Sequence, residues 1–566
     1  MKDKLWKFPL GIASLFLYMF FLVITLSVIC SIFNIGVNLI VLPFSVVVAC
    51  VLLFIDKRFS TLEKIIMIII FLVLFALTVL IASKIYSMDY DGSAYHKLAV
   101  GFLKNGWNPM YESPNDFRTA YFSNESVPSG SPWLESYGKA TWYFAANLYK
   151  LTGTIESGKA YNLIGILVIF FLVLAFFYRK FEGKHFRNIM MAFLIAFNPV
   201  SISQMLSYYE DGFMGSMTFA LIIGLLMLNS DGYKKLEAWA IIFPSMTILG
   251  NIKFTGLGYG GLFCIVFYLF SVIYKFDKNN KKTYGLRCVN FAFTAIFTVA
   301  LVGLSTYVTN VIRFMSPFYP FMGPGKIDVL TQQSPAGFEG KGRLFKYFYG
   351  LFSQTENLNY RGIRPLPMLK IPFTTSAEEI SRCVAEDVRI GGNGVFFSGL
   401  LIIGAFIFIL FVAFRLNDRK FSKEDLLIIT LVLSIIAMAL IISESWWARY
   451  APQTYLLAVI PLYIVLFNER KRVWLYSLPA VFLLVVNNSI WFGYTGETLH
   501  NSTIYTNQFK ELKELSPKTM ELINDWDFAG AIFDLEDNGI QYSLTFDENA
   551  KAEHNAYYNM YKYNIK

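Results

Sequence analysis

Long apolar stretches recur through this chain, and each is long enough to cross about 30 Å of hydrocarbon as a helix. We expect about thirteen membrane-spanning helices, because a soluble fold cannot bury so many apolar surfaces within one core. The predicted spans are residues 10–33, 36–55, 65–84, 160–178, 188–206, 213–229, 237–252, 255–274, 288–310, 394–414, 425–443, 452–468 and 473–492.

The composition is that of a membrane protein rather than a soluble enzyme. Of the 566 residues, 55% are hydrophobic and 16% are charged, whereas soluble domains carry roughly 25% charged residues. No small-residue cleavage site follows the first apolar run, so we expect a retained span rather than a signal peptide. The five cysteines form no CxxC motif and no disulfide framework.

Positive charges gather on one side of the predicted spans. With the N-terminus inside and sides alternating, the inner segments carry 24 Lys and Arg against 11 Asp and Glu, and the outer ones 25 against 29. This asymmetry follows the positive-inside rule. The formal net charge of +9 therefore reflects topology, and we expect no nucleic-acid partner. The pattern predicts a plasma-membrane protein with a cytoplasmic N-terminus and an extracytoplasmic C-terminus, and the composition suggests a bacterial source.

The sequence thus predicts an all-α polytopic membrane protein with a transmembrane module over residues 1–493. Its large outer loops are 85–159 and 311–393, and residues 494–566 form a small extracytoplasmic α/β segment. In the first loop, apolar residues spaced three and four apart predict a helix over 94–103. A second helix is expected from Pro132 to about Leu148. Both are expected to lie flat on the outer membrane surface.

A first acidic cluster, Asp89 and Asp91 with His96 nearby, follows the third predicted span. An aspartate here could act as the general base for an acceptor hydroxyl, because proton removal needs a carboxylate within hydrogen-bond reach. The alternative is that Asp91 or Ser93 caps the following helix. His96 could assist in positioning an acceptor or a phosphate, or simply belong to the helix's polar face.

A second acidic cluster, Glu210 and Asp211, occupies a short outer hairpin. The two carboxylates could position an acceptor or bind a divalent cation, since hard cations prefer carboxylate oxygens. The alternative is an ordinary solvated turn. No cofactor is otherwise indicated.

A third group is cationic and contains Lys253 and Arg449, with Tyr450 beside the arginine. Arginine offers a planar fork for phosphate and lysine a point charge, so the pair could hold a phosphate headgroup. Alternatively, both side chains snorkel to the interface beside an aromatic belt of Trp446 and Trp447. The loop 311–393, with Arg313, Lys326, Arg361 and Arg364, could close over such a site.

No Walker A, GxGxxG, HExxH or GxSxG motif is present. The layout over residues 65–470 instead resembles the GT-C superfamily, the multi-spanning glycosyltransferases that use a polyprenyl-phosphate-linked sugar. Asp89-Tyr90-Asp91 is similar to the family's aspartate after a span, and Glu210-Asp211 to its second acidic position. The strings around Lys253 and Arg449-Tyr450 are similar to donor-phosphate contacts in bacterial protein mannosyltransferases and aminoarabinose transferases.

The resemblance implies an inverting transfer of a sugar from a polyprenyl-phosphate carrier to a glycan, lipid or protein acceptor at the outer membrane face. Asp91 or Asp89 would be the base, and Lys253, Arg449 and Tyr450 the phosphate site. Three other classes stay open: a polysaccharide polymerase or ligase, a flippase for lipid-linked glycans, and a non-catalytic membrane partner in an envelope-assembly complex. A flippase is disfavoured because no Asp, Glu, Lys or Arg lies deep within a predicted span.

Overall fold

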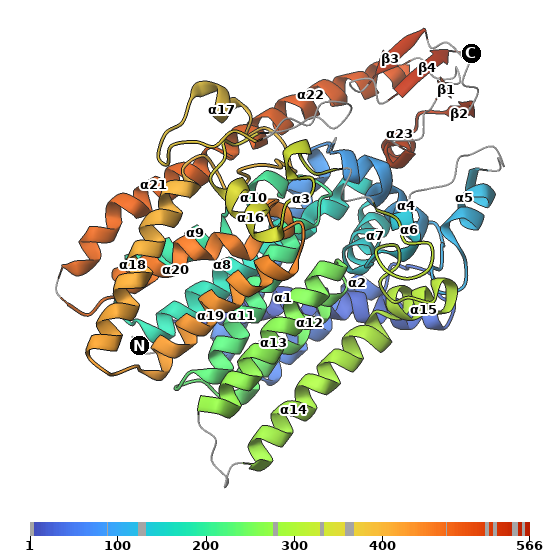
Figure 1. Cartoon of the computed structure of the whole chain (residues 1–566). Helices are drawn as coiled ribbons and strands as arrows, with labels where there is room; N and C mark the ends of the chain where they lie inside the picture. Colours follow the sequence, from blue (N-terminus) through green and yellow to red (C-terminus); the bar gives the residue numbers. More distant parts are fainter. Residues whose placement is uncertain are drawn as a thin grey trace.

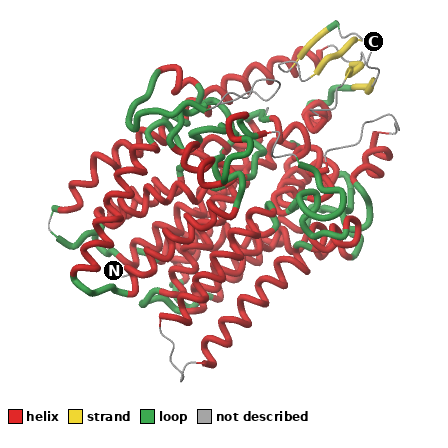
Figure 2. The backbone as a smooth tube through the Cα atoms, in the orientation of Figure 1, coloured by secondary structure: helices red, strands yellow, loops and turns green. Residues whose placement is uncertain are grey.

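The computed structural model describes most of the chain. It covers residues 5–87, 89–122, 132–274, 281–328, 333–356, 367–470, 472–514, 520–523, 529–545, 553–556 and 561–565. These residues are mostly helical, with a small sheet near the C-terminus (Figure 2).

Nine helical segments among the described residues are long and apolar enough to cross a membrane (Figure 1). They are α1 (Lys7–Ile32), α3 (Thr61–Lys84), η3 with α8 (Ile155–Lys180), α11 (Asp211–Asn229), α13 (Phe254–Tyr274), α14 with η5 (Lys281–Val302), α18 (Phe397–Asn417), α19 (Lys423–Ile441), and η11, α21 and α22 together (Val473–Glu514).

The expected count of about thirteen spans is not reproduced, because four predicted spans fall on shorter helices. These are α2 (Val41–Ile55), α9 (His185–Ala196) followed by α10 (Pro199–Gln204), α12 (Lys235–Gly250), and η10 (Pro452–Tyr455) followed by α20 (Leu456–Leu466). The predicted span 188–206 is divided because Asn198 caps a new helix whose first residue is Pro199, and proline cannot continue the preceding hydrogen-bond ladder.

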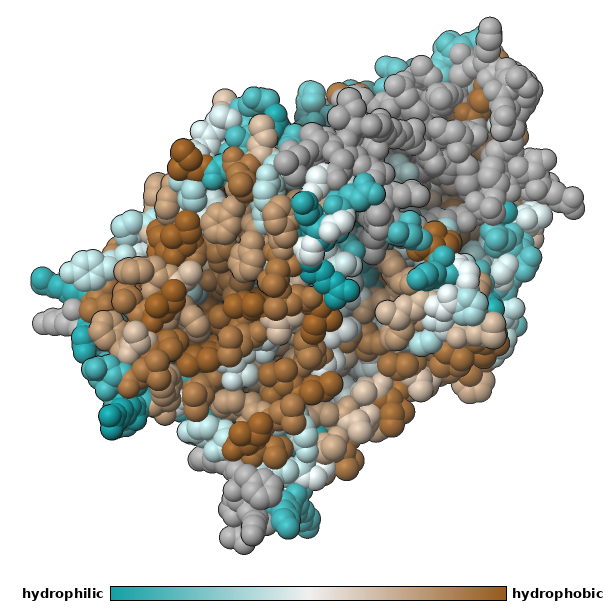
Figure 3. All heavy atoms as spheres, viewed as in Figure 1, coloured by the Kyte–Doolittle hydropathy of each residue, from teal (hydrophilic) through white to brown (hydrophobic). Residues whose placement is uncertain are grey.

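The outer surface of the helices is apolar. On α18, for example, Ile402, Phe406, Ile409 and Phe414 are exposed, and apolar residues cover the middle of the visible face while polar ones lie toward its ends (Figure 3). Such a surface is stable against lipid tails and costly in water. By contrast α11 is almost wholly buried between α8 and α12, and it forms the centre of the bundle.

The inner segments, which carry the excess of Lys and Arg, meet at one end of the bundle. Glu237 pairs with Arg58 (3.2 Å) and with Arg179 (2.6 Å), and Lys180 pairs with Glu424 (3.0 Å). These residues belong to four loops that the charge count places on the same side of the membrane. Ion pairs therefore join these four loops to one another. The acidic clusters lie at the other end of the helices, where α3 ends and α11 begins.

The end that carries the acidic clusters is built from short elements. They are η2 (Gly92–His96), α4 (Lys97–Lys104), α5 (Pro114–Phe122), α6 (Pro132–Ser136), α7 (Ala140–Thr152), η6 (Leu304–Val308), α15 (Thr309–Phe314), η8 (Ala336–Phe338), α16 (Arg343–Leu351), α17 (Ala377–Ser381) and η9 (Ala448–Tyr450). The helix expected over 94–103 starts as the π-helical turn η2, and nearly all of α4 is buried inside the protein. The expectation that it lies flat on a membrane surface is wrong.

The helix expected from Pro132 to about Leu148 is interrupted between α6 and α7. Ala140 donates its N–H to the carbonyl of Asn251 (2.9 Å), and a Cβ on Gly138 would lie 2.4 Å from the same oxygen. Glycine is required at this close backbone approach. The interruption docks α7 onto the connection between α12 and α13, and α7 is buried rather than lying on the surface.

The C-terminal segment expected over 494–566 begins inside α22 (Phe492–Glu514) rather than after it. Beyond it the strands are β1 (Met520–Ile523), β2 (Tyr542–Thr545), β3 (His554–Ala556) and β4 (Tyr561–Ile565), in the order β2-β1-β4-β3. The parallel pair β1 and β2 needs a crossover connection, and this connection contains η12 (Ala529–Ala531) and α23 (Ile532–Asp537).

Candidate functional site

Charged residues from distant parts of the chain meet at the end of the bundle opposite the basic loops. Arg449 Nη1 lies 3.0 Å from Asp91 Oδ2 and 3.7 Å from Asp211 Oδ2, and Lys253 Nζ lies 2.6 Å from Asp211 Oδ1. All three predicted groups are thus brought together: the first acidic cluster through Asp91, the hairpin through Asp211, and the cationic group through Lys253 and Arg449.

Asp89 does not belong to this ion-pair cluster. Its carboxylate is buried and accepts hydrogen bonds from Ser87 Oγ, from the N–H of Gly92 (2.6 Å) and from the N–H of Tyr208 (2.9 Å). Asp89 therefore caps η2 and ties it to the hairpin before α11. The prediction that Asp91 or Ser93 is the cap is wrong, since neither makes a capping hydrogen bond.

Asp91 is the accessible carboxylate of the first cluster. Its side chain is 16% exposed and its hydrogen-bond partner is Arg449. It directly precedes the π-helical turn η2, and such turns occur frequently at functional sites. Asp91 is therefore held in place by a cation while remaining open to a ligand.

The hairpin that carries Glu210 and Asp211 is buried, so the solvated-turn interpretation is wrong. Asn162 of α8 donates to the carbonyls of Ser207 (3.0 Å) and Tyr209 (2.8 Å) and fixes the hairpin backbone. Both acids stand at the N-terminus of α11, where the helix dipole favours negative charge.

Glu210 lies beside His96, and both side chains are fully buried. Thr141 donates its hydroxyl to Glu210 Oε1, and Trp142 donates Nε1–H to His96 Nδ1 (2.7 Å). Burial raises the pKa of Glu210 to about 8, and burial with the charge of Lys253 lowers the pKa of His96. The carboxyl group is thus mostly protonated at neutral pH, and the neutral imidazole carries its proton on Nε2.

Arg449 is enclosed by aromatic rings rather than extended to an interface. Its guanidinium carbon lies 4.3 Å from the ring centre of Trp447, 4.9 Å from that of Tyr209 and 5.2 Å from that of Tyr450. Snorkelling is the wrong interpretation for Arg449, and because Trp446 and Trp447 are buried they form no exposed aromatic belt.

Lys253 is likewise buried, at the turn between α12 and α13. Its ammonium is engaged by Asp211, and it lies 5.7 Å and 6.0 Å from the ring centres of Tyr137 and Tyr450. Lys253 therefore fixes the start of α11 to this turn, and snorkelling is wrong for it as well.

Two further charged residues of the site were not predicted from the sequence: Asp387 and Arg389. Arg389 is buried, with its guanidinium carbon 4.2 Å from the ring centre of Trp447 and Nη2 3.7 Å from Asp387 Oδ2. The available signal was the charged run Glu386-Asp387-Val388-Arg389, which ends one residue before the pair Gly391-Gly392. Runs of this kind are usually solvated, and only the fold reveals that Arg389 is buried.

The other cations proposed to close over the site do not gather there. Arg313 pairs with Glu135 (2.8 Å), and Lys326 is exposed. Arg361 and Arg364 lie outside the described residues.

A divalent-cation site has no ligand set in the part of the chain that the structure describes. No three His, Cys, Asp or Glu side chains converge there to hold a metal ion. Asp211 instead uses its oxygens for Lys253 and Arg449.

A second buried ionic cluster joins the C-terminal segment to the segment that carries Asp91. The ammonium of Lys97 donates to the carbonyl of Ser87 (2.9 Å), to Glu156 (2.5 Å) and to Asp534 of α23 (2.8 Å). Burial opposes its charge, but Asp534 and Glu156 outweigh this effect and raise the pKa of Lys97. All three N–H donors are used, so Lys97 closes the loop from Ser87 to η2.

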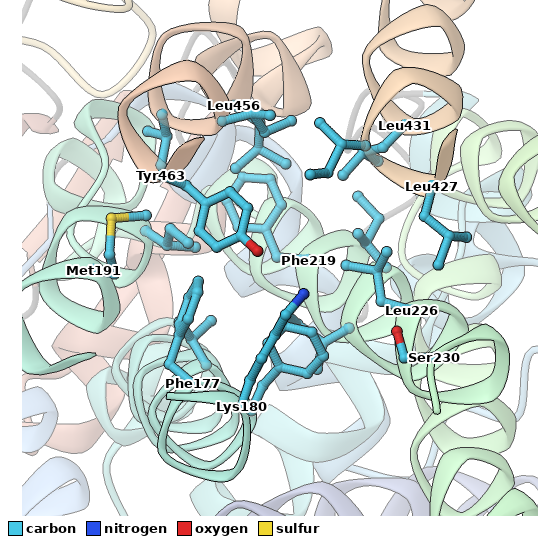
Figure 4. A pocket seen from close by; sticks show the side chains of 18 of the residues that line it. Phe177, Lys180, Met191, Phe219, Leu226, Ser230, Leu427, Leu431, Leu456 and Tyr463 are labelled. Carbon is cyan, nitrogen blue, oxygen red and sulfur yellow. The ribbon is translucent and has the colours of Figure 1, made fainter. Parts of the chain in front are cut away.

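An apolar pocket of about 100 Å³ lies between α8, α9, α11, α19 and α20, away from the charged cluster (Figure 4). Its walls include Phe177, Phe219 and Leu456, and Lys180 lines it at the basic end of the bundle. It shares no residue with the site around Arg449. Its lining suits an alkyl chain rather than a polar ligand.

No family model matches the chain, and a search of curated proteins finds no match.

Proposed function

We propose that the chain is an inverting glycosyltransferase that moves a sugar from a polyprenyl-phosphate carrier to a hydroxyl of a glycan, lipid or protein acceptor. The observation that carries this proposal is the contact between the partly exposed carboxylate of Asp91 and the guanidinium of Arg449 at the ends of apolar helices. The resemblance of the motifs to the GT-C superfamily supports it.

Asp91 fits the role of base better than the other three predicted carboxylic acids. Asp89 uses its carboxylate for three hydrogen bonds within the fold, and Asp211 is fully buried between two cations. Glu210 is mostly protonated at neutral pH, since its pKa is about 8. A base must be within reach of the acceptor, and Asp91 is the one of these four whose side chain is partly exposed, beside the guanidinium of Arg449.

In the proposed step, Asp91 takes the proton of the acceptor hydroxyl as its oxygen attacks C1 of the sugar. The bond from C1 to the carrier phosphate breaks, and the electron pair stays on the phosphate oxygen. Arg449 stabilises that growing negative charge with donors that Asp91 and Asp211 do not use. Its Nε is buried without a hydrogen-bond partner in the described part of the chain.

The proposed location follows from charge. If the basic end of the bundle faces the cytoplasm, as the positive-inside rule predicts, the site and the C-terminal segment face outward from the plasma membrane. A lipid phosphate is available there as leaving group, so the reaction needs no nucleotide.

The polysaccharide polymerase or ligase is the second candidate function, favoured by one observation. Arg389 adds a second buried guanidinium near Arg449, which suits a carrier with more than one phosphate.

The proposed function is tested by replacing Asp91 with Asn in purified protein supplied with polyprenyl-phosphate-linked sugar. We expect the transfer rate to fall by about 100- to 10,000-fold, the usual contribution of a general base. A matched control is Asp116→Asn, because Asp116 is exposed and only caps α5 through Ser113. Transfer by Asp91→Asn at the rate of the control would remove Asp91 as base.

A further inference from the structure

A second, larger cavity lies at the basic end of the bundle and shares no residue with the site around Arg449. Its volume is about 480 Å³, within the range of cavities that hold small ligands, whereas the pocket in Figure 4 has about 100 Å³. α2 and α12 both pack against α1, and the cavity is lined by these three helices and by the loop that follows α2.

The helices give this cavity an apolar wall. It includes Leu15 of α1, Leu52 and Ile55 of α2, and Leu236 at the start of α12. Leu52, Ile55 and Leu236 are exposed, so the wall continues onto the outer surface of the bundle. Exposed apolar side chains of this kind are stable against acyl chains and costly in water. The apolar part of the cavity is therefore accessible to a lipid chain.

The polar part of the lining carries more positive than negative charge. Its two carboxylates, Asp56 and Glu237, are both paired with Arg58, at 2.5 Å and 3.2 Å. Two further cations of the lining, Lys57 and Lys234, are exposed. Three cations thus stand against two acids, and the excess charge is placed where a headgroup can reach it.

Two more lysines add positive charge around the loop that follows α2. Lys7 Nζ donates to the carbonyl of Arg58 (2.6 Å), and Lys64 Nζ donates to the carbonyl of Phe54 (2.6 Å). Backbone carbonyls accept these hydrogen bonds without neutralising the ammonium charges. Glu63, the next acid along the chain, uses its carboxylate to cap the start of α3. The cavity is therefore set in a positive field that attracts anions.

We propose that this cavity binds an anionic glycerophospholipid of the leaflet at the basic end of the bundle, which the positive-inside rule makes the cytoplasmic leaflet. Its phosphate would contact Lys57 and Lys234, and one acyl chain would lie along the apolar wall. Basic pockets between membrane helices suit anionic headgroups. A zwitterionic lipid offers the same phosphate but brings an ammonium into the positive field, so it gains less. The inference does not depend on the proposed transfer reaction, whose site lies at the other end.

The experiment measures binding of dioleoyl phosphatidylglycerol and dioleoyl phosphatidylcholine to the full-length protein in a neutral detergent by native mass spectrometry. We expect the wild type to prefer phosphatidylglycerol. The double variant Lys57→Gln with Lys234→Gln should bind it about 30-fold more weakly, because each lysine near an anionic lipid contributes about fivefold. The matched control is Lys281→Gln with Lys420→Gln, which removes two exposed lysines that do not line the cavity; it should bind as the wild type does.

A second variant tests the cavity without changing any charge. Ala240 of α12 lines the cavity and is partly exposed, so the phenyl ring in Ala240→Phe would occupy the space of the acyl chain. We expect phosphatidylglycerol to bind about tenfold more weakly, the loss of about two buried methylene groups. If Ala240→Phe does not fold, Ala240→Val decides, with an expected loss of about fourfold.

Each contrary result overturns a stated part of the inference. Equal affinity of the wild type for the two lipids, or equal losses in the two lysine pairs, overturns the anionic-headgroup site. Wild-type affinity in a folded Ala240 variant overturns the cavity as the place of binding. Displacement of phosphatidylglycerol by soluble glycerol phosphate, at the concentration at which the lipid itself competes, overturns a lipid site in favour of a free phosphate.

Discussion

The buried ion pair between Asp211 and Lys253 gives a stability prediction that needs no substrate. Replacing Asp211 with Asn leaves the ammonium of Lys253 buried without its 2.6 Å partner and removes the anion that lies between Lys253 and Arg449. Breaking one partner of such a pair costs about 3–5 kcal/mol. For a chain of 566 residues, an unfolding entropy of about 2 cal/mol/K per residue converts this cost into a fall in melting temperature of about 3–4 °C.

The same geometry predicts an asymmetry between the two single variants. Lys253→Met leaves Asp211 with a remaining cation, Arg449 at 3.7 Å, so its cost should be smaller. The double variant Asp211→Asn with Lys253→Met buries no unpaired charge. We expect it to melt above Asp211→Asn alone, because replacing a whole buried pair by uncharged residues is often nearly neutral.

The assay is thermal unfolding in detergent of the wild type, both single variants and the double variant at one protein concentration. A double variant that melts at or below Asp211→Asn would refute the reasoning, since removing an unpaired buried cation must then bring no relief. Purely additive changes would show that the two side chains do not interact in solution.

Four further predictions concern the buried polar groups at this end of the bundle. If the transfer rate needs the proton on Glu210, the wild type should lose activity near pH 8, where this carboxyl group ionises, and Glu210→Gln should keep the rate at pH 7 without that alkaline fall; identical pH profiles would contradict a role for that proton. Because folded Glu210 holds this proton to about pH 8 and the unfolded residue loses it near 4.5, raising the pH across this window should destabilise the wild type more than Glu210→Gln. Asp89→Asn should lower the melting temperature further than Asp91→Asn, since it removes at least one of three buried hydrogen bonds at about 1–3 kcal/mol each; the reverse order would contradict the capping role. Lys97→Met should expose the C-terminal segment to limited proteolysis, whereas the exposed control Lys150→Met should not, and equal digestion of both would contradict the proposed closure.

Sequence pattern was informative where a residue's place in the chain fixes its place in the fold. Asp91 follows one apolar helix and Glu210 and Asp211 precede another. The alternating direction of successive helices was therefore enough to predict that these residues share one end of the bundle. The same logic applied to Lys253 and Arg449. Their burial was not predictable, because a cation at a helix end has the same sequence pattern whether it snorkels or pairs.

Other features depend on tertiary contacts that no local pattern contains. Residues 94–103 have the periodicity of an amphipathic helix, but periodicity does not distinguish a face on lipid from a face covered by protein. Here a Cβ on Gly101 would overlap the ring of Phe533, so the C-terminal segment covers this helix. Arg389 lies in a loop without periodicity, and its burial beside the ring of Trp447 emerges only from the fold.

The contacts of Lys97 also bear on when the protein can complete its site during synthesis. Asp534 lies 437 residues beyond Lys97, so the ammonium is made long before its third acceptor leaves the ribosome. Domains usually fold as the chain emerges, N-terminal parts first, but the segment carrying Asp91 must wait for the C-terminal segment to reach the same side of the membrane. Until Asp534 arrives, the third N–H donor of Lys97 has no protein acceptor, so the segment that carries Asp91 is completed only after the last part of the chain has been made.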